Sequence, residues 1–320
     1  MVGKSKPVRR LIITGVCGNL GEKLLLHFSQ FTSLEKVVGL DIEAALKNKR
    51  FPAPSKMQGQ TPEVEFIACD LTKADDARWR EALQRADGLI HLAADYPFPD
   101  ATWTQASASF DMTANLGLAL AQKRTPTRAI FASSNHVMGE YKDSPLRNSL
   151  DLGGLKTDLP PGVGSKWRTE IKKTDSTPYA TAKIMGERLF VQSANGSSGL
   201  VKAVNIRIGW CNVGENRPAK ITASGSPEHQ HTGQPKNRIP EEEKRSDTSW
   251  FHGMWLSNRD LCHLFERALF ADETAWPGPA ITINGISKNT GAYWSLEEAR
   301  AYVQYEPIDD ICRELNIPHV

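Results

Sequence analysis

A tyrosine and a lysine stand four residues apart in the segment PYATAKIMGERL, as Tyr179 and Lys183. On a helix this spacing places both side chains on one face. An ammonium group near a phenol favours the phenolate, which lowers the pKa of the tyrosine towards the working pH and suits a general base for an alcohol. Because YxxxK is also a common pattern on helix surfaces, a catalytic role for the pair depends on the motifs around it.

Polar residues follow an apolar run in FASSNHVMG, residues 131–139. The run predicts a buried strand, and ligands of doubly wound α/β folds bind at the carboxyl edge of the sheet, where such a strand ends. Ser134 is therefore a candidate catalytic residue beside Tyr179 and Lys183. Asn135 and His136 follow it directly, so we expect them at the same edge.

Three glycines, Gly15, Gly18 and Gly21, lie between an apolar run and a helical pattern in LIITGVCGNLGEKLL. Glycines at this spacing let the backbone turn tightly and approach a pyrophosphate, whose charge is met by free N–H groups and the positive end of the helix dipole. Asp41 ends the next apolar run, 20 residues after Gly21, where a carboxylate accepts hydrogen bonds from an adenosine ribose. Since this carboxylate would repel a 2′-phosphate and no Arg follows it directly, the pattern predicts NAD rather than NADP.

The elements that would position these residues alternate along the chain. From residue 9 to about 210, short apolar runs of β type alternate with helical stretches, which is typical of βαβ units, and their continuous apolar character indicates strands buried on both faces. We therefore predict an α/β fold, a Rossmann-type doubly wound parallel sheet with a small C-terminal substrate-binding part. In that part, residues 255–270 predict a helix with Ser257 as N-cap, ITINGIS predicts a strand, and residues 294–313 predict one or two helices.

Two segments interrupt this alternation, residues 142–177 and 215–249, and both are rich in Pro, Gly and charge. Loops of this length are usually functional or disordered rather than part of a core, and for each segment the sequence leaves a lid and a floppy insertion equally open. Residues 1–212, including the first insertion, are predicted to form the dinucleotide-binding domain. Residues 213–320, including the second, are predicted to be mainly substrate-binding.

The composition favours a globular protein with a small-molecule partner. Of 320 residues, 40% are hydrophobic, and 39 basic against 37 acidic residues leave a net charge of only +2, which argues against nucleic acid. No apolar stretch approaches the ~20 residues that a membrane helix needs. The five cysteines are widely spaced without a CxxC pair, so we expect no metal site, no disulfide framework and a reducing, cytoplasmic compartment.

In this order the motifs resemble the extended short-chain dehydrogenase/reductase superfamily, the NAD-dependent epimerase/dehydratase family. The resemblance lies in TGVCGNLG, ACDLT, HLAA, the helix with Asn115, SSNHVMG, YATAK and IRIG, and it covers most of residues 9–212. Within the superfamily, SSNHVMG, IRIGWC, WLSNRDL and WSLEEARAYVQYEPIDD look most like the uronate dehydrogenases. Those enzymes oxidise the C1 hydroxyl of a hexuronic acid with NAD to a lactone, and relatives often form homodimers through the helices that carry Asn115 and Tyr179.

The resemblance implies roles for individual residues. Tyr179 would take the proton of the substrate hydroxyl, Lys183 would hold the nicotinamide ribose and lower the pKa of Tyr179, and Ser134 would orient the reacting hydroxyl. The residues expected to contact the sugar are Ser134, Asn135, His136, Tyr179 and, as the nearest candidate for binding a sugar carboxylate, Arg217. The residues expected to bind NAD are Gly15, Gly18, Asn19, Leu20, Gly21, Asp41, Ile42, Asp70, Leu71, Leu92, Ala93, Ala94, Asn115, Tyr179, Lys183 and Ile208.

Departures from the uronate dehydrogenases leave other functions open. Trp210 stands where a serine is usual after IRIG, and Asp95 stands where a small serine contact is expected after HLAA. A nucleotide-sugar epimerase would use the same fold, NAD and the Ser–Tyr–Lys set. A catalytically silent NAD-binding regulator would share the fold, although such proteins tend to lose the tyrosine or the lysine.

Several other conspicuous residues are expected to serve packing. His91 in GLIHLAA is expected to be a packed strand histidine rather than a base. Cys17 lies in the glycine loop, where a helix N-terminus can lower a thiol pKa, but a space-filling role is favoured. For Trp250, Trp255 and Trp294 a place in the core is favoured over one in a sugar pocket.

Overall fold

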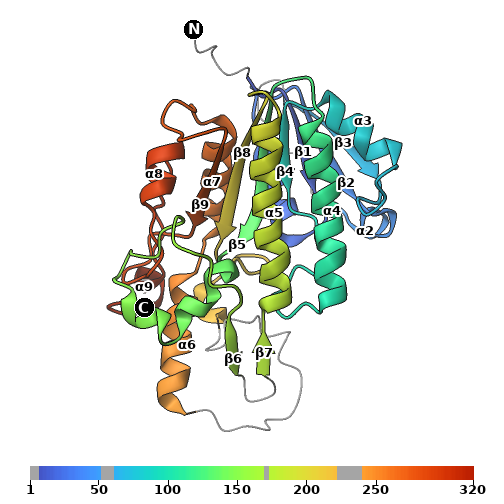
Figure 1. Cartoon of the computed structure of the whole chain (residues 1–320). Coiled ribbons are helices and arrows are strands. Elements are labelled where there is room, and N and C mark those ends of the chain that lie inside the picture. The colour runs from blue at the N-terminus through green and yellow to red at the C-terminus, as the bar shows by residue number, and fades with distance from the viewer. Residues whose placement is uncertain (1–6, 52–60, 169–172, 222–239) are drawn as a thin grey trace.

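Seven parallel strands form the central sheet of the computed structural model, which describes residues 7–51, 61–168, 173–221 and 240–320 (Figure 1). The strand order is β3-β2-β1-β4-β5-β8-β9, so the chain builds one half of the sheet outward from β1, returns to β4, and then builds the other half. This confirms the predicted Rossmann-type, doubly wound α/β fold. The bounds are β1 (Arg10–Thr14), β2 (Lys36–Asp41), β3 (Glu63–Ala68), β4 (Gly88–His91), β5 (Thr127–Ser134), β8 (Val201–Ile208) and β9 (Ala280–Gly285).

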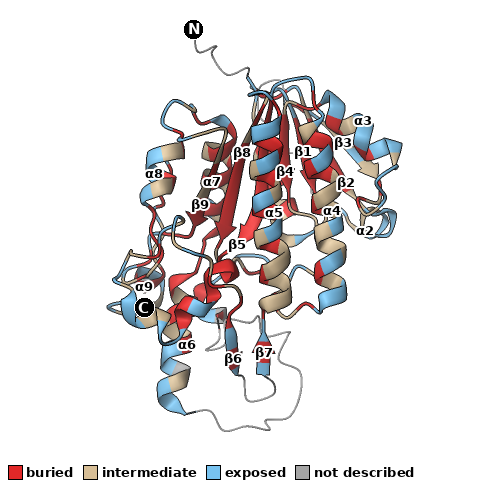
Figure 2. Cartoon of the chain, viewed as in Figure 1, coloured by how far each residue is buried: buried red, intermediate tan, exposed pale blue. Residues whose placement is uncertain are grey.

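Helices cover both faces of this sheet (Figure 1). One layer contains α3 (Ala77–Arg85), α4 (Trp103–Ala121) and α5 (Thr177–Gly196); the other contains α1 (Asn19–Phe28) and α7 (Asn258–Phe270), which contact each other; the short α2 (Glu43–Asn48) follows β2. In β1, Ile12 belongs to the buried cluster under α3 and α4, and its neighbour Ile13 belongs to the cluster under α1 and α7. The inner strands are therefore buried on both faces (Figure 2), which explains their continuous apolar runs, whereas the edge strand β3 has no buried residue.

The C-terminal region contributes to the sheet as well as to its surroundings. The helix predicted over residues 255–270 is α7, and the Ser257 hydroxyl accepts a hydrogen bond from the Asp260 N–H as its N-cap. ITINGIS forms β9, and the tail forms two short helices, α8 (Glu297–Val303) and α9 (Ile311–Leu315). Because β9 pairs in parallel with β8, the sheet extends beyond residue 212.

The first insertion, residues 142–177, contacts the rest of the chain at several of its described positions. It contains the end of the 3-10 helix η1 (Asn135–Lys142), the 3-10 helix η2 (Leu146–Ser149) and the antiparallel strands β6 (Lys166–Arg168) and β7 (Lys173–Asp175), which lie beyond the carboxyl ends of the sheet strands (Figure 1). Trp167 is buried, and Lys142 forms a buried ion pair with Asp247 at 2.7 Å. These contacts favour a fixed wall over a floppy insertion.

The second insertion, residues 215–249, is not irregular throughout. Residues 222–239 lie outside the described residues; before them stands the 3-10 helix η3 (Pro218–Lys220), and α6 (Glu241–Gly253) begins inside the segment. The first turn of α6 carries three glutamates, which suit the positive end of the helix dipole, and its end buries Trp250 and Phe251. The sequence interpretation missed this helix because it ended the segment at Ser249, before the apolar residues that fix the helix.

Candidate active site

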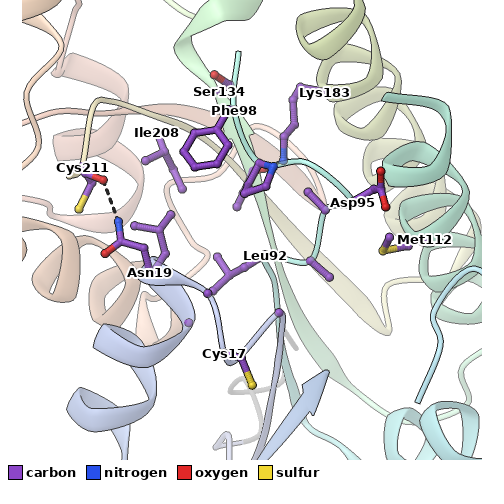
Figure 3. A pocket seen from close by; sticks show the side chains of 18 of the residues that line it. Cys17, Asn19, Leu92, Asp95, Phe98, Met112, Ser134, Lys183, Ile208 and Cys211 are labelled. Carbon is purple, nitrogen blue, oxygen red and sulfur yellow. Dashed lines mark hydrogen bonds between the residues drawn. The ribbon is translucent and has the colours of Figure 1, made fainter. Parts of the chain in front are cut away.

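A cavity of about 640 Å³ lies at the carboxyl edge of the sheet, and Figure 3 shows part of its lining. Segments that follow β1, β2, β3, β4, β5 and β8 line it together with the first turns of α5. The predicted site residues that line the cavity are Gly15, Gly18, Asn19, Leu20, Gly21, Asp41, Ile42, Asp70, Leu71, Leu92, Ala93, Ala94, Ser134, Asn135, His136, Tyr179, Lys183 and Ile208. Asn115 and Arg217 are not part of the lining.

The glycine loop brings the N-terminal backbone of α1 to this cavity. Gly15 has a φ of +67°, and a Cβ there would lie 2.9 Å from the backbone of Ala93. A Cβ on Gly21 would lie 2.2 Å from the carbonyl oxygen of Gly15. The turn therefore requires glycine at both positions, and it places free N–H groups of a helix N-terminus where a pyrophosphate would bind. The side chain of Asn19 fixes the loop by donating to the carbonyl of Cys211 at 2.8 Å (Figure 3).

Asp41 stands at the end of β2 and is oriented by backbone groups. One carboxylate oxygen accepts from the N–H of Cys17 and the other from the N–H of Ile42, each at 2.8 Å. The carboxylate therefore faces the glycine loop, where a ribose hydroxyl would lie. Burial and the nearby Asp41 raise the pKa of the Cys17 thiol to about 12, which argues against an activated thiol; the space-filling role stays a prediction.

Ser134, Tyr179 and Lys183 converge from two elements. Ser134 is the last residue of β5, and Tyr179 lies in the first turn of α5 with Lys183 one turn later. The Lys183 amine donates to the carbonyl of Ala132 at 2.8 Å and lies 5.6 Å from the centre of the Tyr179 ring. All three side chains line the cavity, so the helix spacing and the strand end place them together.

Burial controls the proton affinities of Tyr179 and Lys183. It raises the pKa of Tyr179 to about 12, while the hydrogen bond with Ser134 acts in the opposite direction. It also lowers the pKa of Lys183 to about 8. The tyrosine shift is opposite to the one predicted from the YxxxK spacing, because the lost hydration of the buried phenolate outweighs the stabilising hydrogen bond with Ser134.

Asn135 and His136 open the 3-10 helix η1 and are both buried. Nδ1 of His136 lies 2.9 Å from the hydroxyl of Ser165 and 3.3 Å from that of Ser176. Among the described residues, Nδ2 of Asn135 and Nε2 of His136 have no hydrogen-bond partner. Burial lowers the pKa of His136 to about 3, so its imidazole is neutral and suits hydrogen bonding rather than charge.

The two predicted site residues outside the lining have other contacts. Asn115, on α4, donates to the backbone carbonyl of Leu71 at 2.8 Å, so it supports a cavity-lining segment from behind. Arg217 is exposed and forms an ion pair with Glu215. No sequence motif indicates that Asn115 and Arg217 lie outside the cavity lining, because this depends on where separate segments of the chain lie in space.

The structure also brings residues to the surroundings of His136 that the sequence interpretation did not assign. Trp210 and Asn212 line the cavity, and the Trp210 indole donates to the side-chain oxygen of Asn212 at 3.0 Å. The ring of Trp210 meets His136 edge-on at 6.0 Å, and Trp167 stacks on His136 at 5.9 Å. Trp210 was noted only as a departure from the uronate dehydrogenases, and Trp167 carries no motif.

Several packing expectations are confirmed. His91 is buried in β4 between the hydroxyls of Thr14 at 2.8 Å and Thr113 at 3.0 Å, and burial lowers its pKa to about 3. Trp250, Trp255 and Trp294 are buried outside the cavity lining.

In the part of the chain that the structure describes, no helix is long and apolar enough to cross a membrane, and no three His, Cys, Asp or Glu side chains are grouped to hold a metal ion.

Several characterised proteins are similar to this chain over most of its length. An NAD-dependent glucose-6-phosphate dehydrogenase from Haloferax volcanii is 26% identical over 308 residues, which cover 94% of this chain and 93% of the relative. An L-arabinose 1-dehydrogenase (NAD(P)+) from the same organism is 28% identical over 245 residues, 75% of this chain and 81% of the relative. A uronate dehydrogenase from Pseudomonas putida is 26% identical over 307 residues, 95% of this chain and 85% of the relative.

Solved structures share the fold, and a family model covers the cavity residues. A mutated uronate dehydrogenase is 21% identical with a TM-score of 0.63, covering 98% of this chain and 88% of that one. The UDP-glucuronic acid 4-epimerase from Bacillus cereus, in complex with UDP-glucuronic acid and NAD, is 15% identical with a TM-score of 0.61 and 96% coverage of both chains. The model of the NAD dependent epimerase/dehydratase family matches residues 11–222, so this chain belongs to that family and is an enzyme with NAD as its cofactor.

Proposed function

We propose that this enzyme oxidises the C1 hydroxyl of a free sugar or sugar acid to a lactone. The observation that carries the proposal is the convergence of Ser134, Tyr179 and Lys183 at one end of the NAD cavity. Beside them lie polar atoms of Asn135 and His136 that have no partner within the part of the chain that the structure describes. A buried polar atom without a partner costs about 1–3 kcal/mol, and sugar hydroxyls would remove that cost. The sugar dehydrogenase names of the relatives support the same reaction class.

The residues of the cavity fit NAD. The turn at Gly15 and Gly21 brings backbone N–H groups to the cavity, and Asp41 presents a carboxylate that can accept hydrogen bonds from both ribose hydroxyls. The same carboxylate would lie against the 2′-phosphate of NADP and repel it. When bound, NAD supplies hydride acceptance at the nicotinamide ring.

In the proposed reaction Tyr179 takes the proton of the substrate hydroxyl, while hydride passes to NAD from the carbon that carries this hydroxyl. Ser134, hydrogen-bonded to Tyr179, orients that hydroxyl. Lys183 is held on the Ala132 carbonyl one turn from Tyr179, where its positive charge stabilises the phenolate form of Tyr179 that accepts the proton. Because its pKa is about 8, Lys183 is mostly protonated at neutral pH.

One absorbance experiment tests this proposal. The purified protein is mixed with NAD or NADP and a panel of hexuronic acids, neutral aldoses, sugar phosphates and nucleotide sugars, with Tyr179→Phe measured alongside. We expect NADH to form from a free sugar or sugar acid. Conversion of a nucleotide sugar without net NADH would select an epimerase, and a silent panel with tight NAD binding would select a regulator.

The proposal includes a homodimer built through α4 and α5. These helices lie side by side on one face of the sheet (Figure 1), and each exposes a large apolar side chain, Leu118 and Met185. Exposed apolar groups of this kind support a protein contact. Light scattering at micromolar concentration tests it, and a monomeric mass would contradict it.

The proposal also keeps the predicted domain roles and compartment. The position of α6 beyond the carboxyl edge of the sheet supports a substrate-binding role for residues 213–320 (Figure 1). The five cysteines are all free, which agrees with a reducing cytoplasm.

A further inference from the structure

A buried ion pair lies directly behind the catalytic residues and has no role in the reaction as described so far. Glu187 follows Lys183 by four residues on α5, so Tyr179, Lys183 and Glu187 occupy three successive turns of nearly the same helix face. Glu187 and its partner Arg207 on β8 are each 3% exposed. Their contact is bidentate, with both guanidinium-to-carboxylate distances at 3.0 Å.

The same carboxylate reaches a second strand. The hydroxyl of Ser133 donates to Oε1 of Glu187 at 2.5 Å. Ser133 on β5 and Arg207 on β8 are direct partners in the strand ladder, and the residue after each, Ser134 and Ile208, lines the cavity. Glu187 therefore joins α5 to two strands at the edge of the cavity, which Ser133 itself lines.

A lysine contact one turn earlier makes this joint rigid. Lys183 donates to the carbonyl of Ala132, and Glu187 accepts from Ser133, so consecutive helix turns bind consecutive residues of β5. Sliding α5 along β5 would break both contacts at once. The position of Tyr179 relative to Ser134 is thus tied to the contacts of Glu187.

The ion pair of Glu187 and Arg207 has no net charge, which affects the pKa of the Lys183 ammonium one helix turn away. The described titratable side chains around Lys183 include Tyr179 on α5, His91 on β4 and His136 on η1, and all three are uncharged at neutral pH because burial moves their pKa values to about 12, 3 and 3. Burial alone lowers the pKa of Lys183. The charge of Glu187 is cancelled by Arg207, whose guanidinium stays protonated.

We propose that Glu187 is a positioning residue for the reaction: with Arg207 and Ser133 it locks α5 against β5 and β8 in the register that brings Tyr179 to Ser134. This rests on the proposed dehydrogenase function. A misplacement of about 1 Å at reacting groups can lower turnover roughly 100-fold, so a loosened joint reaches the chemistry without touching substrate.

The chain offers a matched control at the other end of the same strand. Arg128, near the start of β5, is buried and pairs with Glu273 at 2.6 Å. Residues 128 and 134 lie about 20 Å apart along an extended strand. Glu273→Gln therefore makes the same chemical change to a buried arginine partner, away from the site.

The test compares Glu187→Gln with Glu273→Gln and Ser133→Ala in the full-length protein. With the sugar identified by the panel, we expect Glu187→Gln to lower kcat by about 10- to 100-fold with the KM for NAD within about twofold. We expect a smaller loss of kcat in Ser133→Ala and an unchanged kcat in Glu273→Gln. Equal kcat losses in Glu187→Gln and Glu273→Gln at matched folded fraction would overturn the proposal.

A second measurement needs no turnover. Glu187→Gln removes a negative charge one helix turn from Lys183 and leaves the charge of its partner Arg207 uncancelled, so we expect the pKa of Lys183 to fall, as measured by NMR titration of lysine labelled with carbon-13 at Cε. Glu273→Gln should leave that pKa unchanged, and Lys183→Met assigns the signal. An unmoved Lys183 pKa in Glu187→Gln would overturn the proposal even if the substrate panel is silent, whereas a silent panel with a shifted pKa would reject only the dehydrogenase function.

Discussion

The two ends of the cavity differ in how far the chain satisfies its own polar groups. At the cofactor end, Asp41 already accepts two backbone hydrogen bonds and Asn19 donates to a carbonyl. At the other end, where we propose that the sugar binds and which we call the sugar end, Asn135 and His136 each leave a buried polar atom without a partner among the described residues. The cofactor end is therefore formed before ligand binds, whereas the sugar end keeps hydrogen-bonding capacity for its ligand.

The largest expected effect is on kcat and comes from Tyr179, which lies between the two ends of the cavity. Tyr179→Phe keeps the ring and removes the hydroxyl, so we expect kcat to fall by about 10³-fold because a general base is lost. The affinity for NAD, measured by fluorescence titration, should change by less than about threefold, since the phenol adds one hydrogen bond at most. Turnover comparable to that of the wild type would reject the role of Tyr179 as the base.

A smaller effect is confined to the cofactor end. Asp41→Ala removes a charged acceptor for the ribose, so the KM for NAD should rise by about 10- to 100-fold, as expected for a hydrogen bond to a charged group. The discrimination against NADP should relax in the same variant, and the KM for the sugar should not change. Steady-state kinetics with both dinucleotides measure this, and unchanged cofactor kinetics would remove Asp41 from the site.

The pH dependence of stability compares a buried histidine that lines the cavity, His136, with one packed in β4 outside the lining, His91. Burial holds both pKa values at about 3, against ~6.5 in the unfolded chain. The unfolded state therefore binds more protons between these values, so stability is full above pH 6.5 and is lost as the pH falls towards 3. Each histidine should cost ~2 kcal/mol of unfolding free energy between pH 7 and pH 5.

Urea titrations at pH 7 and pH 5 measure this loss. The wild type should lose unfolding free energy from pH 7 to pH 5. His136→Phe and His91→Phe should each make this loss smaller by the contribution of one histidine. An equal loss of unfolding free energy between pH 7 and pH 5 in the wild type and both variants would show that neither imidazole stays neutral in the folded protein.

The smallest expected effect is a change in the KM for the sugar without a change in the KM for NAD, which distinguishes the two ends of the cavity. His136→Phe keeps an aromatic ring between Trp167 and Trp210 but removes the unpartnered Nε2, so the KM for the sugar should rise by about 3- to 10-fold, the value of one neutral hydrogen bond. The KM for NAD should remain within about twofold. A larger change in NAD kinetics than in sugar kinetics would contradict the division of the cavity into two ends.

The cofactor end was the part most accessible to prediction from sequence. Gly15, Gly21 and Asp41 act through local backbone geometry, and the order of strands and helices follows from hydrophobic periodicity, so both are encoded by neighbouring residues. The helix α6 was missed because its polar first turns depend on Trp250 and Phe251 for their stability, and these lie beyond the polar segment. Local pattern alone does not reveal such dependence.

The sequence by itself determined the fold, the nucleotide loop and the Tyr179–Lys183 pair, because each depends on residues a few positions apart. Only the tertiary structure decided that Arg217 lies outside the cavity lining, that Trp167 stacks on His136, and that Glu187 joins two strands. It also decided the direction of the Tyr179 pKa shift, since burial is a property of the whole fold. Contacts between distant segments and the hydration they remove have no local signature in the chain.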